Sequence, residues 1–235
     1  MSTDDTISKL LIIKEFQNLS LKELGTVASI CHRHRYESGD DIVRYHDNSN
    51  SVFLIFQGQI RVTYHSLSGH EVILCNLPAG EIFGELTAID GRARSATVVA
   101  KADTELASIS APNFLNLIYS NQNIAAAILS RLTGQVRRLT ERIYDFSTLA
   151  VRSRIHAELL RLAKKQAATP NMATITSAPT HTDLANLVST HREAVTRELN
   201  NLVRKKLIER KGHDLHILDV CTLTKMVNDV RGSLE

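Results

Sequence analysis

The sequence predicts an α+β fold: a jelly-roll-like β-roll with N-terminal helices, then a long helix, then a small helical domain that contains a β-hairpin. Between residues 36 and 112, short β-branched runs alternate with turn residues about every ten positions, which is typical of antiparallel strands closing into a barrel or roll. Residues 113–166 contain no proline and one glycine, which favours helix. Beyond residue 180, two short helical patterns precede a basic hairpin. We therefore expect three segments, at 1–112, 113–150 and 151–235.

The charge of the chain is unevenly distributed. Its 235 residues carry a formal net charge of +3. Residues 1–149 hold 14 basic and 16 acidic side chains, a net charge of −2, whereas residues 150–235 hold 14 basic and 9 acidic ones, a net charge of +5. If nucleic acid is a partner, it is therefore expected to bind the carboxyl-terminal third.

Composition and cysteine usage exclude several classes of protein. A hydrophobic fraction of 43% supports packed cores, so the chain is neither disordered nor fibrous. Residues 1–30 contain no uninterrupted apolar run, so we expect no signal peptide, no membrane partner and a cytoplasmic location. Cys31, Cys75 and Cys221 lack metal-ligand spacing, which argues against disulfides and an iron–sulfur sensor, and no metal is expected. Cys75 is interpreted as a structural thiol, with a haem ligand as the alternative.

Residues 1–35 show helical spacing in two apolar groups, and we expect them to form packing helices. Ser20 is placed to cap the second helix. The first group is Leu10, Leu11 and Ile13, and the second is Leu21, Leu24, Val27, Ala28 and Cys31.

The strand-rich segment contains one clear hairpin pattern. Residues 52–64 (VFLIFQGQIRVTY) are interpreted as two paired strands that turn at Gln57–Gly58. Further strands are expected at 71–77 and 95–100. Other turns are expected at Gly39–Asp40, Asp47–Asn48, Ser68–Gly69 and Gly80.

A polar loop at residues 82–98 (IFGELTAIDGRARSATV) carries the first chemical signal. Gly84 to Leu86 have the pattern of a helix start, whose free N–H groups attract an anion. Arg94 and Ser95 add a planar fork and a hydroxyl, which suit the oxygens of one phosphate. Glu85 would repel a phosphate, but it can accept a hydrogen bond from a neighbouring sugar hydroxyl, so the loop indicates a nucleotide. The alternative is a surface ion pair between Glu85 and Arg94.

Residues 113–166 are expected to form a long helix, a break and a second helix. Apolar side chains on the first alternate steps of four and three, which is the pattern of a coiled-coil seam. A seam needs a partner, and the simplest is a second copy of the chain, so we expect a homodimer. The alternative is a helix docked on its own β-roll. The seam residues are Ala125, Leu129, Leu132, Val136, Leu139, Ile143, Phe146 and Ala150.

Two short helices beyond residue 180 carry the second chemical signal. Thr180-x-x-Asp183 is a capping box that opens a helix over 182–188, and a break at Ser189–Thr190 precedes a second helix. This is the helix-turn-helix arrangement, whose second helix enters the major groove of DNA. On the first helix, Leu184, Ala185, Leu187 and Val188 are available for packing. On the second, one face holds Val195, Glu198, Leu199 and Leu202, and the other holds Arg192, Glu193, Thr196 and Arg197.

The polar face of the second helix suits bases as well as phosphates. Guanine acceptors match an arginine fork, and the cytosine amine matches a carboxylate. Glu193 beside two arginines therefore favours sequence-specific reading of double-stranded DNA. The alternative is that Thr190 and Glu193 form only a capping box.

Basic residues continue into a predicted hairpin around Gly212, which would form the wing of a winged helix-turn-helix domain. We interpret them as phosphate contacts; a solvated helix end that complements its dipole is the alternative. His213 and His216 are interpreted as surface residues rather than metal ligands. Residues 167–179 are expected to form turns or a short hairpin. The basic residues are Arg204, Lys205, Lys206, Arg210 and Lys211.

The succession FGEL, DGRA and RSA resembles the phosphate-binding cassette of cyclic-nucleotide-binding domains. The resemblance implies that Glu85 meets the ribose 2′-hydroxyl, that Gly84 permits close backbone approach, and that Arg94 and Ser95 hold the cyclic phosphate. It also implies that polar residues of a long dimer helix meet the base. These positions fall on Leu139, which cannot form a hydrogen bond, and Thr140, which can donate or accept one. We expect cAMP as the ligand, and cGMP is the alternative, since Ser95 could meet a base in the syn form.

The pattern Arg-Glu-x-Val-x-Arg, here from Arg192 to Arg197, resembles the recognition helix of the CRP/FNR superfamily of bacterial transcription regulators. The resemblance implies that Arg192 and Arg197 read guanines and that Glu193 reads a cytosine in a TGTGA-like half-site. RNA polymerase is an implied partner. Two residues depart from the family: Ser189 replaces a frequent turn glycine, and His191 replaces a small capping residue and could add a phosphate contact.

These motifs, in order across residues 10–220, predict a homodimeric, sequence-specific DNA-binding transcription regulator under allosteric control by a 3′,5′-cyclic nucleotide. A family member that responds to another signal is one alternative, and an architectural DNA-binding dimer without ligand control is a second. A cyclic-nucleotide hydrolase is the third, but no metal-ligand cluster or activated nucleophile accompanies Arg94, so we do not expect an enzyme.

Overall fold

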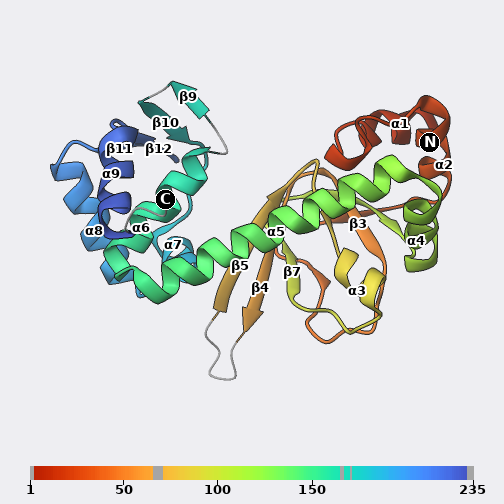
Figure 1. Cartoon of the computed structure of the whole chain (residues 1–235), viewed down its shortest axis with the longest axis horizontal. Coiled ribbons are helices and arrows are strands. Elements are labelled where there is room, and N and C mark those ends of the chain that lie inside the picture. Colours follow the sequence, from red (N-terminus) through yellow and green to blue (C-terminus); the bar gives the residue numbers. More distant parts are fainter. Residues whose placement is uncertain (1–2, 66–70, 165–166, 170, 232–235) are drawn as a thin grey trace. The chain divides into compact units, whose positions relative to one another are not determined.

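The computed structural model describes residues 3–65, 71–164, 167–169 and 171–231 (Figure 1). The chain divides into two compact units, Met1–Gln135 and Val136–Glu235, and each is described by itself. This division falls inside the long helix rather than at its ends, so the three-segment division of the sequence stays a prediction. Within the described ranges, no helix is long and apolar enough to cross a membrane.

Antiparallel strands build the first unit, as the spacing of turn residues predicted. The strands are β1 (His32–Tyr36), β2 (Asp41–Val43), β3 (Val52–Gln57), β4 (Gln59–His65), β5 (Glu71–Pro78), β6 (Ile82–Phe83), β7 (Thr97–Ala100) and β8 (Thr104–Ile109). The described strands form two four-stranded sheets, ordered β1-β8-β3-β6 and β2-β7-β4-β5. All residues of β8 and the first five of β3 are buried. The β-roll is therefore confirmed, with β3 and β8 at its centre.

The predicted hairpin over residues 52–64 is wrong. β3 pairs with β6 and β8, whereas β4 pairs with β5 and β7, so the chain passes from one sheet to the other at Gly58. Gly58 has a φ of +89°, and a Cβ there would lie 2.5 Å from Oγ1 of Thr104. The continuous apolar run of β3 is typical of a central strand. Both edges of β3 are occupied by β8 and β6, so the turn at Gly58 leads β4 into the other sheet. The predicted turn at Ser68–Gly69 lies outside the described residues.

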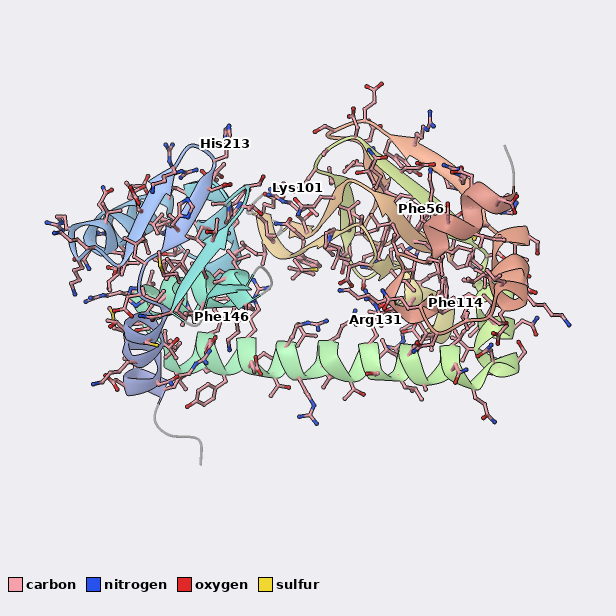
Figure 2. All side chains as sticks on the ribbon, turned by 90° about the horizontal axis from the view of Figure 1, so that it is seen from above. Phe56, Lys101, Phe114, Arg131, Phe146 and His213 are labelled. Carbon is pink, nitrogen blue, oxygen red and sulfur yellow. The ribbon has the colours of Figure 1, made fainter. Side chains whose placement is uncertain are left out.

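Helices cover one side of the roll. They are α1 (Thr3–Leu10), the short 3-10 helix Lys14–Phe16, α2 (Leu21–Ser29), α4 (Ala111–Ser120) and the first half of α5 (Gln122–Thr148). Ser20 caps α2 in a capping box with Glu23, as predicted. Leu11 and Leu21 are 44% and 74% exposed, so these two do not join the core. The buried side chains that join helices to strands include Phe56 and Phe114 (Figure 2).

The predicted helical stretch 113–166 contains two breaks rather than one. Asn121 separates α4 from α5, because its side-chain oxygen accepts hydrogen bonds from the backbone N–H groups of Asn123 and Ile124 at 3.0 and 3.1 Å. The second break follows Thr148, and α6 (Val151–Lys164) begins beyond it. On α5, Ile124 and Ile128 are buried against the roll. The seam residues Leu129, Val136, Leu139 and Ile143 are 64%, 63%, 56% and 66% exposed.

The second unit combines helices with a four-stranded sheet of order β11-β12-β10-β9. The segment 167–179 contributes a hairpin, as expected, and Gly212, with a φ of +60°, turns the second one. The predicted packing residues of both short helices are buried. The elements are β9 (Ala167–Thr169), β10 (Met172–Ile175), α7 (His181–Val188), α8 (Arg192–Arg204), β11 (Ile208–Lys211), β12 (Asp214–Ile217) and α9 (Val220–Arg231).

Candidate functional site

The loop of residues 82–98 folds as β6, the short helix α3 (Glu85–Asp90) and β7. Gly84 precedes α3 with a φ of +84°, a conformation that glycine adopts readily. A Cβ on Gly84 would lie 2.6 Å from Nη1 of Arg94 and 2.9 Å from the carbonyl oxygen of Ser51. The glycine therefore allows Arg94 to reach the start of α3, which brings the two ends of the motif together.

Arg94 is buried, with 3% of its surface exposed. Its guanidinium donates hydrogen bonds to Oγ of Ser49 at 3.1 Å and to the carbonyl oxygens of Gly84 at 3.1 Å and Ser51 at 2.7 Å. Burial lowers the pKa of Arg94, while Asp47 and Glu85 oppose that change. An arginine still keeps its charge in proteins. A cation is thus fixed beside the free N–H groups of α3, which favours an anionic ligand.

Glu85 is also buried, with 4% exposed, so the alternative of a surface ion pair with Arg94 does not describe these residues. Its carboxylate accepts a hydrogen bond from Nε2 of Gln135 on α5 at 3.1 Å. One turn earlier on α5, Arg131 donates to Glu81 at 2.6 Å and to the carbonyl oxygen of Ile82. Figure 2 shows Arg131 projecting from α5 towards the roll. The long helix therefore contacts the loop at two points.

Arg131 and Gln135 were not predicted as site residues, although the sequence carries a signal for them. Ile124, Ile128, Arg131 and Gln135 follow one another in steps of four, three and four, which is the same stripe of α5. Two polar residues that continue a buried apolar stripe indicate polar partners on the facing surface.

The other side chains predicted to contact the ligand are exposed. The side chains of Leu86 and Ser95 are exposed, beside the buried Glu85 and Arg94. Leu139 and Thr140 are exposed residues of α5 in the second unit, and the hydroxyl of Thr140 donates to the carbonyl oxygen of Val136 at 3.0 Å. Their contact with a base stays a prediction. Among the described residues, no group of three or more His, Cys, Asp and Glu could hold a metal ion.

The two helices of the second signal form as predicted. Thr180 caps α7 in a capping box with Asp183. Ser189 then adopts the left-handed conformation with a φ of +50°, so it takes the backbone role of the family's turn glycine. The N-cap of α8 is His191, and its side chain makes no capping hydrogen bond. The alternative capping box between Thr190 and Glu193 is therefore wrong, and the carboxylate of Glu193 is exposed.

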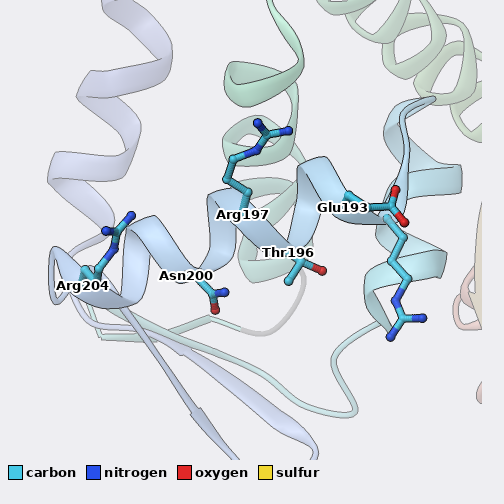
Figure 3. A pocket seen from close by; sticks show the side chains of 6 residues that line it. Glu193, Thr196, Arg197, Asn200 and Arg204 are labelled. Carbon is cyan, nitrogen blue, oxygen red and sulfur yellow. The ribbon is translucent and has the colours of Figure 1, made fainter.

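The polar face of α8 forms an open depression of about 750 Å³ (Figure 3). All four predicted residues of this face line it, together with Asn200 and Arg204, which extend the face by two turns. The exposed His191 lies outside this lining. Asn200 was missed, although it follows Thr196 by four residues and so shares its side of the helix, as Figure 3 shows. The lining residues are Arg192, Glu193, Thr196, Arg197, Asn200 and Arg204.

The buried face of α8 is fixed to α6 by a polar cluster. The carboxylate of Glu198 accepts hydrogen bonds from Nε2 of His156 at 2.7 Å, Nε of Arg152 at 3.2 Å and Nδ2 of Asn201 at 3.2 Å. Burial lowers the pKa of His156, and the interaction with Glu198 opposes this. On the other side of α8, Nδ1 of His181 lies 2.8 Å from Oγ1 of Thr196. Both faces of the helix thus have fixed partners.

Two family models match the chain. A cyclic nucleotide-binding domain matches residues 33–121, and a Crp-like helix-turn-helix domain matches residues 153–226. The cAMP-activated global transcriptional regulator CRP of Salmonella typhimurium is 31% identical over 78% of this chain and 88% of its own. The cAMP-activated regulator Vfr of Pseudomonas aeruginosa is 29% identical over 82% of this chain and 92% of its own.

Solved structures share the fold. A CooA mutant from Carboxydothermus hydrogenoformans has a TM-score of 0.77 at 20% identity, and the alignment covers 92% of this chain and 95% of the CooA chain. The c-di-GMP-responsive regulator CLP of Xanthomonas campestris has a TM-score of 0.71 at 22% identity and covers 85% of this chain and 99% of its own.

The fold and the two matched domains define a cyclic-nucleotide-binding transcription regulator with a DNA-binding helix-turn-helix domain. The chain belongs to the CRP/FNR superfamily.

Proposed function

We propose that this chain is a homodimeric regulator that binds cAMP and, in response, reads a palindromic TGTGA-like site. The observation that carries the proposal is the pair of buried side chains, Glu85 and Arg94, that lie beside Gly84 at the start of α3. A fixed cation and free N–H groups suit the cyclic phosphate, with the exposed hydroxyl of Ser95 beside them. Glu85 supplies an acceptor for the ribose 2′-hydroxyl.

The ligand assignment also draws on relatives, because those at about 30% identity are cAMP-activated regulators. The c-di-GMP-responsive regulator of similar fold indicates that the fold alone does not fix the nucleotide. Thr140 is the polar residue assigned to the base, and Leu139 offers only an apolar contact. cGMP is therefore the second candidate, favoured by the exposed Ser95 hydroxyl.

Dimerisation is supported by the exposed apolar stripe of α5. Leu129, Val136, Leu139 and Ile143 are each more than half exposed, and they repeat at coiled-coil spacing. A second copy of the chain is the simplest cover for such a stripe. Two copies would then place two α8 helices in successive major grooves, and ligand binding would shift their spacing.

DNA reading is assigned to the exposed face of α8. Arg192 and Arg197 suit guanine, and Glu193 suits the amine of cytosine. The exposed basic residues of the hairpin and of the end of α8 suit phosphates, so binding should weaken steeply as salt rises. His191, which is exposed at the start of α8, is assigned an additional phosphate contact in this proposal.

Titration of the full chain with cAMP and with cGMP by calorimetry tests the ligand assignment. Ser95→Ala is expected to weaken cAMP binding about tenfold, because it removes one hydrogen bond to a charged group. Arg94→Lys keeps the charge but loses the fork, and should weaken binding at least as much. Ser29→Ala, which changes an exposed serine of α2, is the matched control. No binding of either nucleotide at millimolar concentration would remove the proposed ligand control.

Fluorescence anisotropy with a TGTGA palindrome and a scrambled duplex tests the DNA assignment. With saturating cAMP, we expect a preference for the palindrome that Glu193→Ala reduces and Glu209→Ala, which changes an exposed acid of β11, leaves intact. Equal affinity for both duplexes would support the architectural alternative. Recovery of cAMP after prolonged incubation is the corresponding check on hydrolase activity, and we expect it to be complete.

A further inference from the structure

The hydroxyl of Thr196 has a fixed partner that belongs to a different helix. His181 is the first residue of α7, and its Nδ1 lies 2.8 Å from Oγ1 of Thr196 in the middle of the DNA-facing side of α8. Both side chains are half-buried. A hydroxyl has one hydrogen to donate and two lone pairs that accept. If Thr196 donates its hydrogen to His181, it can only accept from a second partner; if it accepts from His181, its hydrogen remains available to that partner.

We propose that His181 is a specificity-determining residue, because it sets whether Thr196 presents a hydrogen-bond acceptor or a donor to the base pair that it faces. The inference deepens the proposed function and rests on it. When Nδ1 of His181 is unprotonated, Thr196 donates its hydrogen to His181 and offers lone pairs to the groove. When Nδ1 carries a proton, Thr196 accepts from His181, and its own hydrogen is free for the groove.

The surrounding charges favour the unprotonated state at neutral pH. Arg192 lies one turn before Thr196 on α8, and Arg210 lies on β11; both are cationic. The lone pair on Nδ1 is the negative end of the imidazole dipole, so positive charge on the side of Thr196 favours a bare Nδ1. Burial, followed by Arg210 and Arg192, lowers the pKa of His181.

The other elements that pack on α7 place their charges elsewhere. On α7 itself, Asp183 is tied into the capping box with Thr180. Arg142 of α5 and Arg154 of α6 donate to the carbonyl oxygens of Leu187 and Ser189, at the opposite end of α7 from His181. Within the protein, burial and then Arg210 and Arg192 disfavour the protonated form of His181. DNA phosphates would oppose them when DNA is bound.

The chemical consequence is a pH-dependent choice of base. Above the pKa of His181, Thr196 accepts and should favour a base that presents an amine, which is adenine or cytosine. Below it, Thr196 donates and should favour a base that presents only acceptors, which is guanine or thymine, over cytosine, which presents only an amine. The exchange should affect one position in each half-site and leave the positions read by Arg192 and Arg197 unchanged.

A set of duplexes with all four bases at each position tests this inference. The full chain with saturating cAMP would be titrated with each duplex by anisotropy at about pH 7.5 and about pH 5.5, at constant salt. We expect a single position where the ratio of the affinity for cytosine to the affinity for guanine falls about fivefold or more at the lower pH. The base preference of Thr196→Val at that position should not change with pH, because the hydroxyl is absent.

His181→Asn separates the bond from its titration. The asparagine amide can hold the Thr196 hydroxyl, but it does not change charge with pH, so the exchange should disappear while affinity remains. His216→Asn is the matched control, because Nδ1 of His216 makes the same kind of bond to Thr174 at 3.0 Å, on strands rather than on α8. His216→Asn should retain the exchange.

A measurement without DNA tests the protonation state of His181 separately from base recognition. In 15N spectra of the full chain, Nδ1 of His181 should be unprotonated at about pH 7.5, and Thr196→Val should alter its shift. A protonated Nδ1 at that pH, or a base profile of the wild type that does not depend on pH, would overturn this inference and leave the proposed function standing. A chain that binds all duplexes alike would overturn both.

Discussion

Gln135 of α5 donates a hydrogen bond from Nε2 to Oε1 of Glu85, the first residue of α3, across 3.1 Å. An ionised carboxylate has two oxygens, so this bond leaves Oε2 for a ribose hydroxyl. We interpret Gln135 as a positioning residue that orients Glu85. It also joins the proposed nucleotide site to the helix that carries the exposed seam.

Gln135→Leu is expected to weaken cAMP binding about five- to tenfold, because one hydrogen bond to a charged group no longer fixes Glu85. Thr133→Ala is the control, since the exposed Thr133 only donates to the carbonyl oxygen of Leu129 in its own helix. Calorimetric titration measures both variants. Tighter binding by Gln135→Leu would mean that Gln135 competes with the nucleotide for Glu85 instead of orienting it.

Gly84→Ala should be destabilised both by backbone strain and by a steric clash, whereas Gly91→Ala should show the backbone strain alone. Both glycines have positive φ, +84° and +70°, so both substitutions strain the backbone. At Gly84 the new Cβ would also collide with Arg94 and Ser51, whereas nothing lies within 4 Å at Gly91. We expect losses in the free energy of unfolding of about 1 kcal/mol for Gly91→Ala and about 2–4 kcal/mol for Gly84→Ala. Urea unfolding of the full chain measures them, and equal losses would contradict the clash.

The local chemistry of the sequence was enough to predict most of the helices and strands that carry the two candidate sites. Ser20 and Thr180 cap helices because a hydroxyl three residues before an acid satisfies the first N–H groups of a helix. The strand turn at Gly58 was located correctly, but its partner strands were not. Pairing is decided by contacts between residues distant in sequence, here β3 with β8, which a local pattern does not contain.

The same limit applies to the site. Glu85, Arg94 and the exposed face of α8 follow from motif spacing, but the hydrogen bonds from Gln135 to Glu85 and from His156 to Glu198 join residues 50 and 42 positions apart. Glu198 illustrates the difference: its place on the buried face was predicted from helical periodicity. The partner that makes its burial tolerable could be found only once α6 was placed beside α8.

His156 should make the second unit less stable in acid. Its Nε2 bonds to Glu198, while its Nδ1 is buried and has no hydrogen-bond partner among the described residues, so a proton added there would have no acceptor. Burial lowers the folded-state pKa of His156, and Glu198 opposes this, so the unfolded chain binds the proton more readily. The contribution of His156 to stability is fully present above the pKa of the unfolded chain, about 6.5, and is lost as the pH falls below that value. The free energy lost is about 1.4 kcal/mol for each unit by which folding lowers the pKa.

Urea midpoints of the full chain at about pH 7.5 and about pH 5.5 measure this effect. His156→Gln retains a donor to Glu198 but does not titrate, so it should lose less stability on acidification than the wild type. His216→Gln, on the sheet of the same unit, should respond to pH as the wild type does. An equal acid response of the wild type and His156→Gln would assign the effect to other groups.

The exposed stripe on α5 predicts how the dimer can be broken without unfolding the chain. Leu129→Glu and Ile143→Glu would place a carboxylate in the seam, which is unfavourable because a charge would be buried without a partner. In the monomer both sites are exposed, 64% and 66%, so the free energy of unfolding should change by less than about 0.5 kcal/mol. Sedimentation equilibrium should give a dimer for the wild type and at least a ~100-fold weaker association for each variant. Leu21→Glu, at an exposed leucine of α2 outside the seam, should remain dimeric, and a dimer that survives both seam substitutions would place the interface elsewhere.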